Sequence, residues 1–210
     1  IRPSPSGGTL GGVARRTRES LLLCEAAGFG VIVVETVGVG QSETAVADMV
    51  DMFLLLLAPG GGDELQGIKK GIVELADLVV VNKADGDLAP AAERARMEYA
   101  SALHLLKPAH PKWSPKVLKV SARDRAGIDA VWSNIGAFRE ALGPDDGIRT
   151  KRAEQARAWM WSEITEGLVQ RLKSDRAIAG LVADLEAEVM AGQTTPGVAA
   201  GRALDAFIGR

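Results

Sequence analysis

The sequence predicts an α/β domain with a mostly parallel sheet, followed by an all-helical segment. Three short apolar runs, at 31–34, 52–57 and 78–81, lack the apolar–polar alternation of half-exposed strands, as expected for strands that are covered on both faces. Helix-compatible segments separate these runs, and this order of elements gives parallel strands. After residue 147 no further run of this kind occurs, so the sheet belongs to the first part of the chain.

The first predicted elements are a loop, a helix and a strand. Residues 3–12 are rich in Pro, Ser and Gly, and the apolar run 21–24 predicts a helix that ends near Gly28. Val31–Val34 is β-branched throughout and predicts the first strand, which ends at Glu35. Ligands of α/β sheets bind at the carboxyl ends of the strands, so the residues from Glu35 onward are site candidates.

Three further strands are predicted, and polar or turn residues follow each of them. These strands are 52–57, 78–81 and 116–120. The helices predicted between and after them are a short one from Ser42, then 64–75, 89–106 and 128–142. Gly or Pro residues end most of these segments, as expected for helix stops.

The chain changes character after Asp145-Asp146-Gly147. The pattern from there onward is helical, with breaks near Ser174 and across residues 192–197. We therefore predict three helices at 149–173, 176–191 and 196–208. The chain then divides into an α/β domain, residues 1–146, and a C-terminal helical segment, residues 147–210.

The composition excludes several classes of protein. With 25 Lys and Arg against 27 Asp and Glu, the formal net charge is −2, so the chain has no basic surface for gripping nucleic acid. One Cys and two His cannot supply a disulfide or the four ligands of a structural zinc site. The longest apolar run, near residues 53–58, is too short to span a bilayer. We expect a soluble cytoplasmic protein that binds neither nucleic acid nor membrane.

The strongest functional pattern is Asn82-Lys83-Ala84-Asp85, directly after a predicted buried strand. A carboxylate at the end of such a loop accepts paired hydrogen bonds from N1–H and the exocyclic amine of guanine. Adenine offers no matching pair, and an unpaired buried carboxylate costs about 1–3 kcal/mol or more, so Asp85 would select guanine. Lys83 can lay its stem over the base, and Asn82 can tie the loop to its neighbours.

Two other loops carry the complementary parts of a nucleotide site. Glu35 ends a strand three residues before Gly38; a carboxylate there can hold Mg²⁺ through a water, and Gly38 lets a backbone N–H touch a γ-phosphate. Ser121-Ala122-Arg123 follows the last predicted strand, where small residues let backbone N–H groups reach the O6 atom of a purine. No residue is singled out as catalytic.

A phosphate-binding loop is not found in the sequence. No G-x-x-x-x-G-K-[ST] motif occurs, and the Gly-rich run 7–12 lacks its lysine. A base reader and a metal acid without a phosphate cradle make an incomplete nucleotide site. We therefore expect the remaining part upstream of Ile1, with this chain as the C-terminal portion of a longer protein.

Several long runs identify the chain with a known family. The run from Arg2 to Ala14, ETVGVGQSE at 35–43, DELQGIKKG at 63–71 and VVVNKADGD at 79–87 resemble the MeaB/ArgK/MMAA family. Its members are P-loop GTPases of the SIMIBI type that chaperone the adenosylcobalamin-dependent methylmalonyl-CoA mutase. Bacterial members are also labelled LAO/AO transport system kinases or ATPases. The similarity covers essentially the whole chain.

The resemblance implies roles for particular residues and partners. It implies three switch regions, at 2–14, 35–43 and 63–71, with Gln66, Lys69 and Lys70 relaying the nucleotide state to the mutase. It implies GTP or GDP and Mg²⁺ as ligands, and a homodimer through the C-terminal helices. The family's phosphate loop and its strand would lie upstream of Ile1. That strand would sit between the strand ending at Glu35 and the one ending near Ala58, and its absence should leave a gap.

The leading hypothesis is a GTPase chaperone that gates cobalamin loading or protection of methylmalonyl-CoA mutase or a related mutase, with little activity in these residues alone. One alternative is a transport-system kinase or ATPase for lysine, arginine and ornithine. Another is a non-catalytic fragment for dimerisation and partner binding. Nickel-inserting GTPases need Cys and His ligands that this sequence scarcely has.

Overall fold

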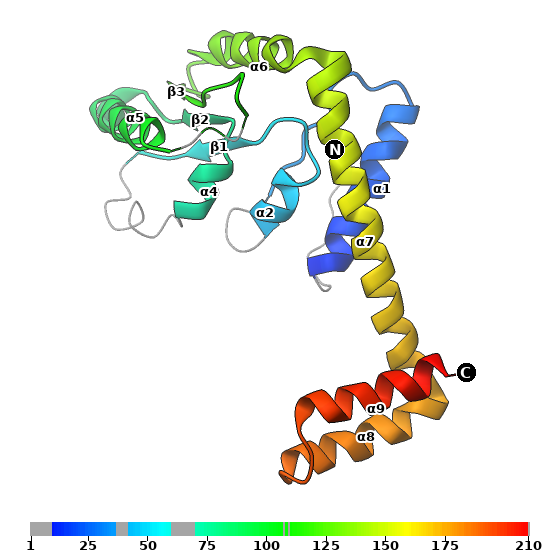
Figure 1. Cartoon of the computed structure of the whole chain (residues 1–210). Coiled ribbons are helices and arrows are strands. Elements are labelled where there is room, and N and C mark those ends of the chain that lie inside the picture. Colours follow the sequence, from blue (N-terminus) through cyan, green and yellow to red (C-terminus); the bar gives the residue numbers. More distant parts are fainter. Residues whose placement is uncertain (1–9, 37–41, 60–69, 107, 109, 210) are drawn as a thin grey trace. The chain divides into compact units, whose positions relative to one another are not determined.

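A computed structural model describes the chain except residues 1–9, 37–41, 60–69, 107, 109 and 210. The chain divides into two compact units, residues 1–155 and 156–210, and each is considered by itself. The first unit holds the sheet and the helices around it (Figure 1). The second holds most of α7 (Arg149–Ser174) together with α8 (Arg176–Met190) and α9 (Pro196–Ile208).

The sheet of the first unit has three parallel strands in the order β1-β2-β3 (Figure 1). The strands are β1 (Leu54–Leu57), β2 (Leu78–Val81) and β3 (Lys116–Lys119). In their register, Leu54 lies opposite Leu78, and Leu78 lies opposite Lys116. Parallel pairing and three of the four predicted strands are thus confirmed, and β2 has the predicted bounds.

Helices cover both faces of this sheet. The described α-helices of the first unit are α1 (Leu10–Ala26), α2 (Ser42–Ala47), α4 (Lys70–Leu75), α5 (Ala89–His104), α6 (Ile128–Leu142) and the start of α7; the short helices η1 (Gly86–Leu88) and η2 (Gly143–Ile148) flank α5 and α6. Val79 and Val81 of β2 pack with buried residues of α4 and α5, whereas Leu78 and Val80 pack on the other face with Val131 of α6. Each β2 side chain is at most 1% exposed. Burial of each contributes about 1.5–3 kcal/mol, which explains the run without alternation.

The prediction of a strand at Val31–Val34 is wrong. These residues have no assigned secondary structure, and Val31 and Val33 are 62% and 83% exposed. A β-branched run becomes a strand only where a neighbouring strand completes the hydrogen-bond ladder. The sheet of the described residues ends at β1 on that side, so the run has no partner there.

A third cluster anchors the amino end of β2. Trp113 contacts Phe138 of α6 edge to face, with ring centroids 5.3 Å apart. The indole Nε1 of Trp113 donates a hydrogen bond of 2.8 Å to the backbone oxygen of Asp77. Because Asp77 directly precedes β2, these contacts fix the position of the amino end of the strand.

The second unit is helical, as predicted, and capping residues set its helix starts. Asp175 accepts hydrogen bonds from the N–H groups of Ala177 and Ile178 at the start of α8. Thr195 caps α9 in the same way. Between α8 and α9 the buried side chains are Ile178, Leu185 and Ala199. Among the residues that the structure describes, no helix has the length and apolar character needed to cross a membrane.

Candidate functional site

The loops after β2 and β3 meet at the carboxyl edge of the sheet. Because the two strands are adjacent and parallel, Val81 lies opposite Lys119, and the chains leave the sheet side by side. Backbone hydrogen bonds continue beyond the strands, from Val120 N to Val81 O at 2.8 Å and from Ala84 N to Val120 O at 2.9 Å. The loop that carries Asp85 is therefore fixed against the loop that carries Ser121.

Asp85 is held between these two loops. Its side chain is 13% exposed, and its Oδ2 accepts a hydrogen bond of 2.6 Å from Ser121 Oγ. Its Oδ1 forms an ion pair of 2.9 Å with an Nη atom of Arg123. Ser121 is 2% exposed, so this hydroxyl is a rigid support. The carboxylate thus has a fixed position and faces a partly open surface.

Asn82 joins the two loops through its side chain. Its Oδ1 accepts hydrogen bonds from Lys83 N at 2.7 Å and from Ala122 N at 3.1 Å. The Ala122 N–H, which the sequence analysis expected to reach a purine O6, is thus donated to Asn82 Oδ1 in this structure. Lys83 has a φ of 57°, the left-handed conformation, and its side chain is exposed. Five predicted residues, Asn82, Asp85, Ser121, Ala122 and Arg123, are therefore brought together, with Lys83 on the same loop.

The turn after β3 depends on two residues that the sequence analysis did not single out. Asp124 donates from its backbone N–H to Ser121 Oγ at 3.0 Å, which fixes the hydroxyl's orientation. Gly127 has a φ of 80°, and a Cβ there would lie 2.7 Å from the backbone oxygen of Lys119. Only glycine fits this close approach, which lets α6 start directly after the loop. The position of a glycine just before a predicted helix was a usable signal for Gly127.

Asp124 also holds the side chain of Arg123. The Nε atom of Arg123 lies 2.9 Å from Asp124 Oδ1, and an Nη atom lies 3.3 Å from Oδ2. The hydrogen bond to Asp124, and then the charges of Asp124 and Asp85, raise the pKa of Arg123. The hydrogen bond from Arg123 lowers the pKa of Asp124. Arg123 is thus shared between two carboxylates.

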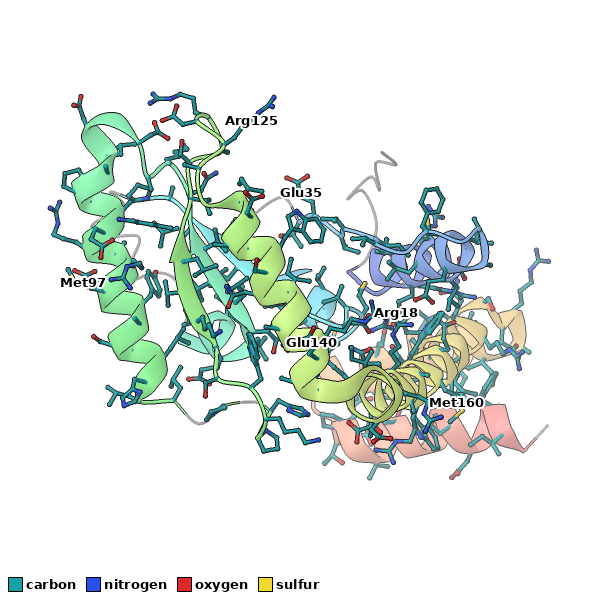
Figure 2. The ribbon with its side chains drawn as sticks, turned by 90° about the horizontal axis from the view of Figure 1, so that it is seen from above. Arg18, Glu35, Met97, Arg125, Glu140 and Met160 are labelled. Carbon is teal, nitrogen blue, oxygen red and sulfur yellow. The ribbon has the colours of Figure 1, made fainter. Side chains whose placement is uncertain are left out.

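The other predicted site residues are only partly described. Glu35 is exposed and follows the unpaired segment 31–34; Figure 2 shows it toward the same edge of the drawing as Arg125. Gly38, Gln66 and Lys69 lie outside the described residues, and Lys70 starts α4 without a described side chain. Within the described ranges, no group of three or more His, Cys, Asp or Glu side chains is arranged to hold a metal ion. Glu35 is the described residue that the sequence analysis predicted for the Mg²⁺ end of the site.

A second polar cluster lies at the amino ends of the strands, and the sequence analysis missed it. Arg152, near the start of α7, donates to both carboxylate oxygens of Asp51 at 2.6 and 2.5 Å. Arg152 also pairs with Glu25 at 2.8 Å, and these partners raise its pKa. Asp77 accepts from Phe53 N at 2.9 Å, and burial raises its pKa despite that bond. The partners are far apart in sequence, so no local pattern predicts them.

Comparison with known proteins identifies the family. A family model described as methylmalonyl Co-A mutase-associated GTPase MeaB matches residues 1–177. The chain belongs to this family. It is 56% identical over 207 residues to a putative GTPase of Caulobacter vibrioides, covering 99% of the chain and 63% of that protein. It is 50% identical over 210 residues to the mitochondrial methylmalonic aciduria type A homolog of Mus musculus, covering 100% of the chain and 51% of that protein.

A solved structure agrees with this family assignment. The crystal structure of a LAO/AO transport system kinase matches with a TM-score of 0.79 and 39% identity, over 100% of the chain and 66% of that structure. The family therefore has the P-loop GTPase fold expected from the sequence. The chain spans about half to two thirds of the length of these relatives.

Proposed function

We propose that the protein to which these residues belong binds and hydrolyses GTP, and that the loops after β2 and β3 read the guanine base. The observation that carries this proposal is the fixed carboxylate of Asp85, which Ser121 supports at 2.6 Å. A carboxylate held in this way presents two acceptor oxygens in one plane. Guanine supplies two donors in line, whereas adenine does not, so the same geometry favours guanine.

The chemistry of the base end fits a purine nucleotide. Lys83 is exposed beside Asp85, and its stem can cover one face of the base. Asn82 accepts the N–H of Ala122 beside the carboxylate, so a purine O6 bound there would have to share or replace that acceptor. Together these side chains would bind and orient the base, which places the phosphates toward the carboxyl ends of the other strands.

The phosphate end of the proposed site rests on Glu35 and Gly38. Glu35 would hold Mg²⁺ through a water, and Gly38 would offer its backbone N–H to the γ-phosphate. When bound, the metal ion neutralises charge on the phosphates. The residues of the chain would contribute positioning and charge rather than a covalent nucleophile.

We further propose that this GTPase acts on an adenosylcobalamin-dependent mutase, methylmalonyl-CoA mutase or a relative, as the family description suggests. Gln66, Lys69 and Lys70 would convey the nucleotide state to that partner. The cobalamin would be handled through the mutase, since the chain has one Cys and two His.

Dimerisation through the C-terminal helices is the last part of the proposal. Along α7, four large apolar side chains recur at helical spacing and stay 42–60% exposed: Met160, Trp161, Ile164 and Leu168. Such a stripe on an otherwise polar helix is typical of a surface that another helix covers. A second copy of the chain is the partner that we propose.

The proposed nucleotide specificity is tested by competition binding on the natural-length protein. Labelled GTP is displaced with unlabelled GTP or ATP, in the wild type and in Asp85→Ala. We expect ATP to compete at least 100-fold more weakly in the wild type, and the two nucleotides to compete nearly equally in the variant. Asp87→Ala, which removes an exposed carboxylate two residues away, should behave as the wild type. Equal competition by ATP in the wild type would contradict the proposal.

A further inference from the structure

Arg123 occupies an oxygen atom that a guanine base needs. In the structure an Nη atom of Arg123 lies 2.9 Å from Asp85 Oδ1, while Ser121 holds Oδ2. Guanine donates from N1–H and from its exocyclic amine, so it requires both carboxylate oxygens. Oδ2 has lone pairs to spare beside one hydroxyl hydrogen bond. Oδ1 instead pairs with the charged guanidinium of Arg123, which is a much larger group than the Ser121 hydroxyl.

Arg123 is far more accessible to solvent than the carboxylate with which it pairs. Asp85 is 13% exposed and Arg123 is 68% exposed. A base that arrives from solvent therefore meets the guanidinium before it meets the carboxylate. The base and Arg123 compete for the same atom.

Asp124 offers the Arg123 guanidinium a second carboxylate. Arg123 Nε already lies 2.9 Å from Asp124 Oδ1, and an Nη atom lies 3.3 Å from Oδ2. Arg123 can thus release Asp85 without losing its second carboxylate. Asp124 is held in turn by its backbone N–H on Ser121 Oγ, so one buried hydroxyl sets the positions of both carboxylates.

We propose that Arg123 is an internal competitor of the base: its guanidinium covers Asp85 and withdraws onto Asp124 as guanine enters. The inference rests on the proposed guanine site and adds a regulation of its filling. An exposed ion pair is weak, so the cover slows base entry by about two- to fivefold and does not block it. Adenine has no pair of donors to replace the Arg123 ion pair, so its entry would leave the Asp85 carboxylate unpaired. The competition by Arg123 therefore also disfavours adenine.

The rate of nucleotide association separates this role from simple base stacking. Association and dissociation of a fluorescent methylanthraniloyl-GDP are measured by stopped flow on the natural-length protein. Arg123→Met removes the ion pair but keeps an apolar stem, so association should be about two- to fivefold faster than in the wild type. Asp124→Asn removes the second carboxylate and leaves Arg123 to Asp85 alone, so association should be slower.

Charge changes alone predict the opposite results. Loss of an arginine weakens attraction of the phosphates, and loss of an aspartate strengthens it. Arg125→Met is the matched control. Arg125 is an exposed arginine in the same loop (Figure 2), and it forms no ion pair with another residue that the structure describes. It should not associate faster than the wild type. In the double variant Arg123→Met with Asp124→Asn, the slowing by Asp124→Asn should disappear.

Two results would overturn the inference. If Arg123→Met changed only dissociation, Arg123 would be a stacking residue and no competitor. If it changed association no more than Arg125→Met does, the pair with Asp85 would have no part in base entry. Failure of the wild-type protein to bind the labelled GDP at all would instead contradict the proposed function, and the inference with it.

Discussion

Removal of the Ser121 hydroxyl should lower the stability of the fold and leave Asp85 of the proposed base site less firmly positioned. Ser121 is 2% exposed, donates to Asp85 Oδ2 at 2.6 Å and accepts from Asp124 N at 3.0 Å. In Ser121→Ala the carboxylate loses a charge-assisted hydrogen bond, and a backbone N–H loses its acceptor. The first loss is worth about 1.5–3 kcal/mol when the acceptor is buried.

The net effect is smaller because water reaches both partners in part. Asp85 is 13% exposed and Asp124 is 51% exposed, so solvent replaces some of the lost hydrogen bonding. We expect the free energy of unfolding to fall by about 1–2 kcal/mol. In a chain of this size that lowers Tm by about 2–8 °C.

Chemical denaturation of the wild type, Ser121→Ala and Ser133→Ala measures this effect. Ser133 is exposed and donates only to the backbone oxygen of Asp129 within α6, so Ser133→Ala should stay within about 0.5 kcal/mol of the wild type. The guanine-nucleotide affinity of Ser121→Ala should also fall, about 5- to 30-fold, because Asp85 is no longer held in place. Equal unfolding curves for the two serine variants would refute the reasoning that Ser121 supports Asp85.

Three other predictions concern stability and assembly. Arg152→Ala should lower the free energy of unfolding by about 1 kcal/mol, because it breaks a two-point pair with Asp51 and a contact to Glu25 that solvent partly screens; denaturation measures it. Burial raises the pKa of Asp77 above 3.8, so the folded state binds more protons and loses stability as pH rises through that raised value; Asp77→Asn should lack this loss in pH-dependent unfolding. Trp161→Glu should convert the proposed dimer to monomers in analytical ultracentrifugation, because it places a charge in the apolar stripe of α7.

Matched variants make these three results interpretable. Arg149→Ala removes an exposed arginine from the same helix and should change stability little. Asp87→Asn should keep the pH dependence of the wild type. Trp132→Glu alters an exposed tryptophan of α6, which is 52% exposed, and should leave the proposed dimer intact. If Arg152→Ala, Asp77→Asn or Trp161→Glu behaved like its control, the interaction proposed for that residue would be wrong.

The sequence predicted best where burial alone decides the structure. Leu78–Val81 has its predicted bounds because helices cover both faces of a central strand, so every side chain must be apolar. Val31–Val34 is just as apolar and is no strand, since pairing depends on a neighbouring strand that composition does not reveal.

The candidate site divides in the same way. Adjacent parallel strands bring Asp85 to Ser121, and the sequence analysis had placed both residues on loops that directly follow predicted strands. The role of Asp124 depends on the rotamer of Arg123 and on one backbone N–H, for which the sequence offers no periodic signal. The pair of Arg152 with Asp51 joins residues 101 positions apart and has no local pattern at all.

The most direct test of the central claim exchanges the acceptor for a donor at Asp85. In Asp85→Asn the amide keeps the size of the carboxylate but donates from one side, which suits the C2 carbonyl of xanthine instead of the exocyclic amine of guanine. We predict, for the natural-length protein, that GTP affinity falls about 100-fold and that xanthosine triphosphate then binds more tightly than GTP. Unchanged preference for GTP over xanthosine triphosphate in Asp85→Asn would contradict the claim that Asp85 reads the base.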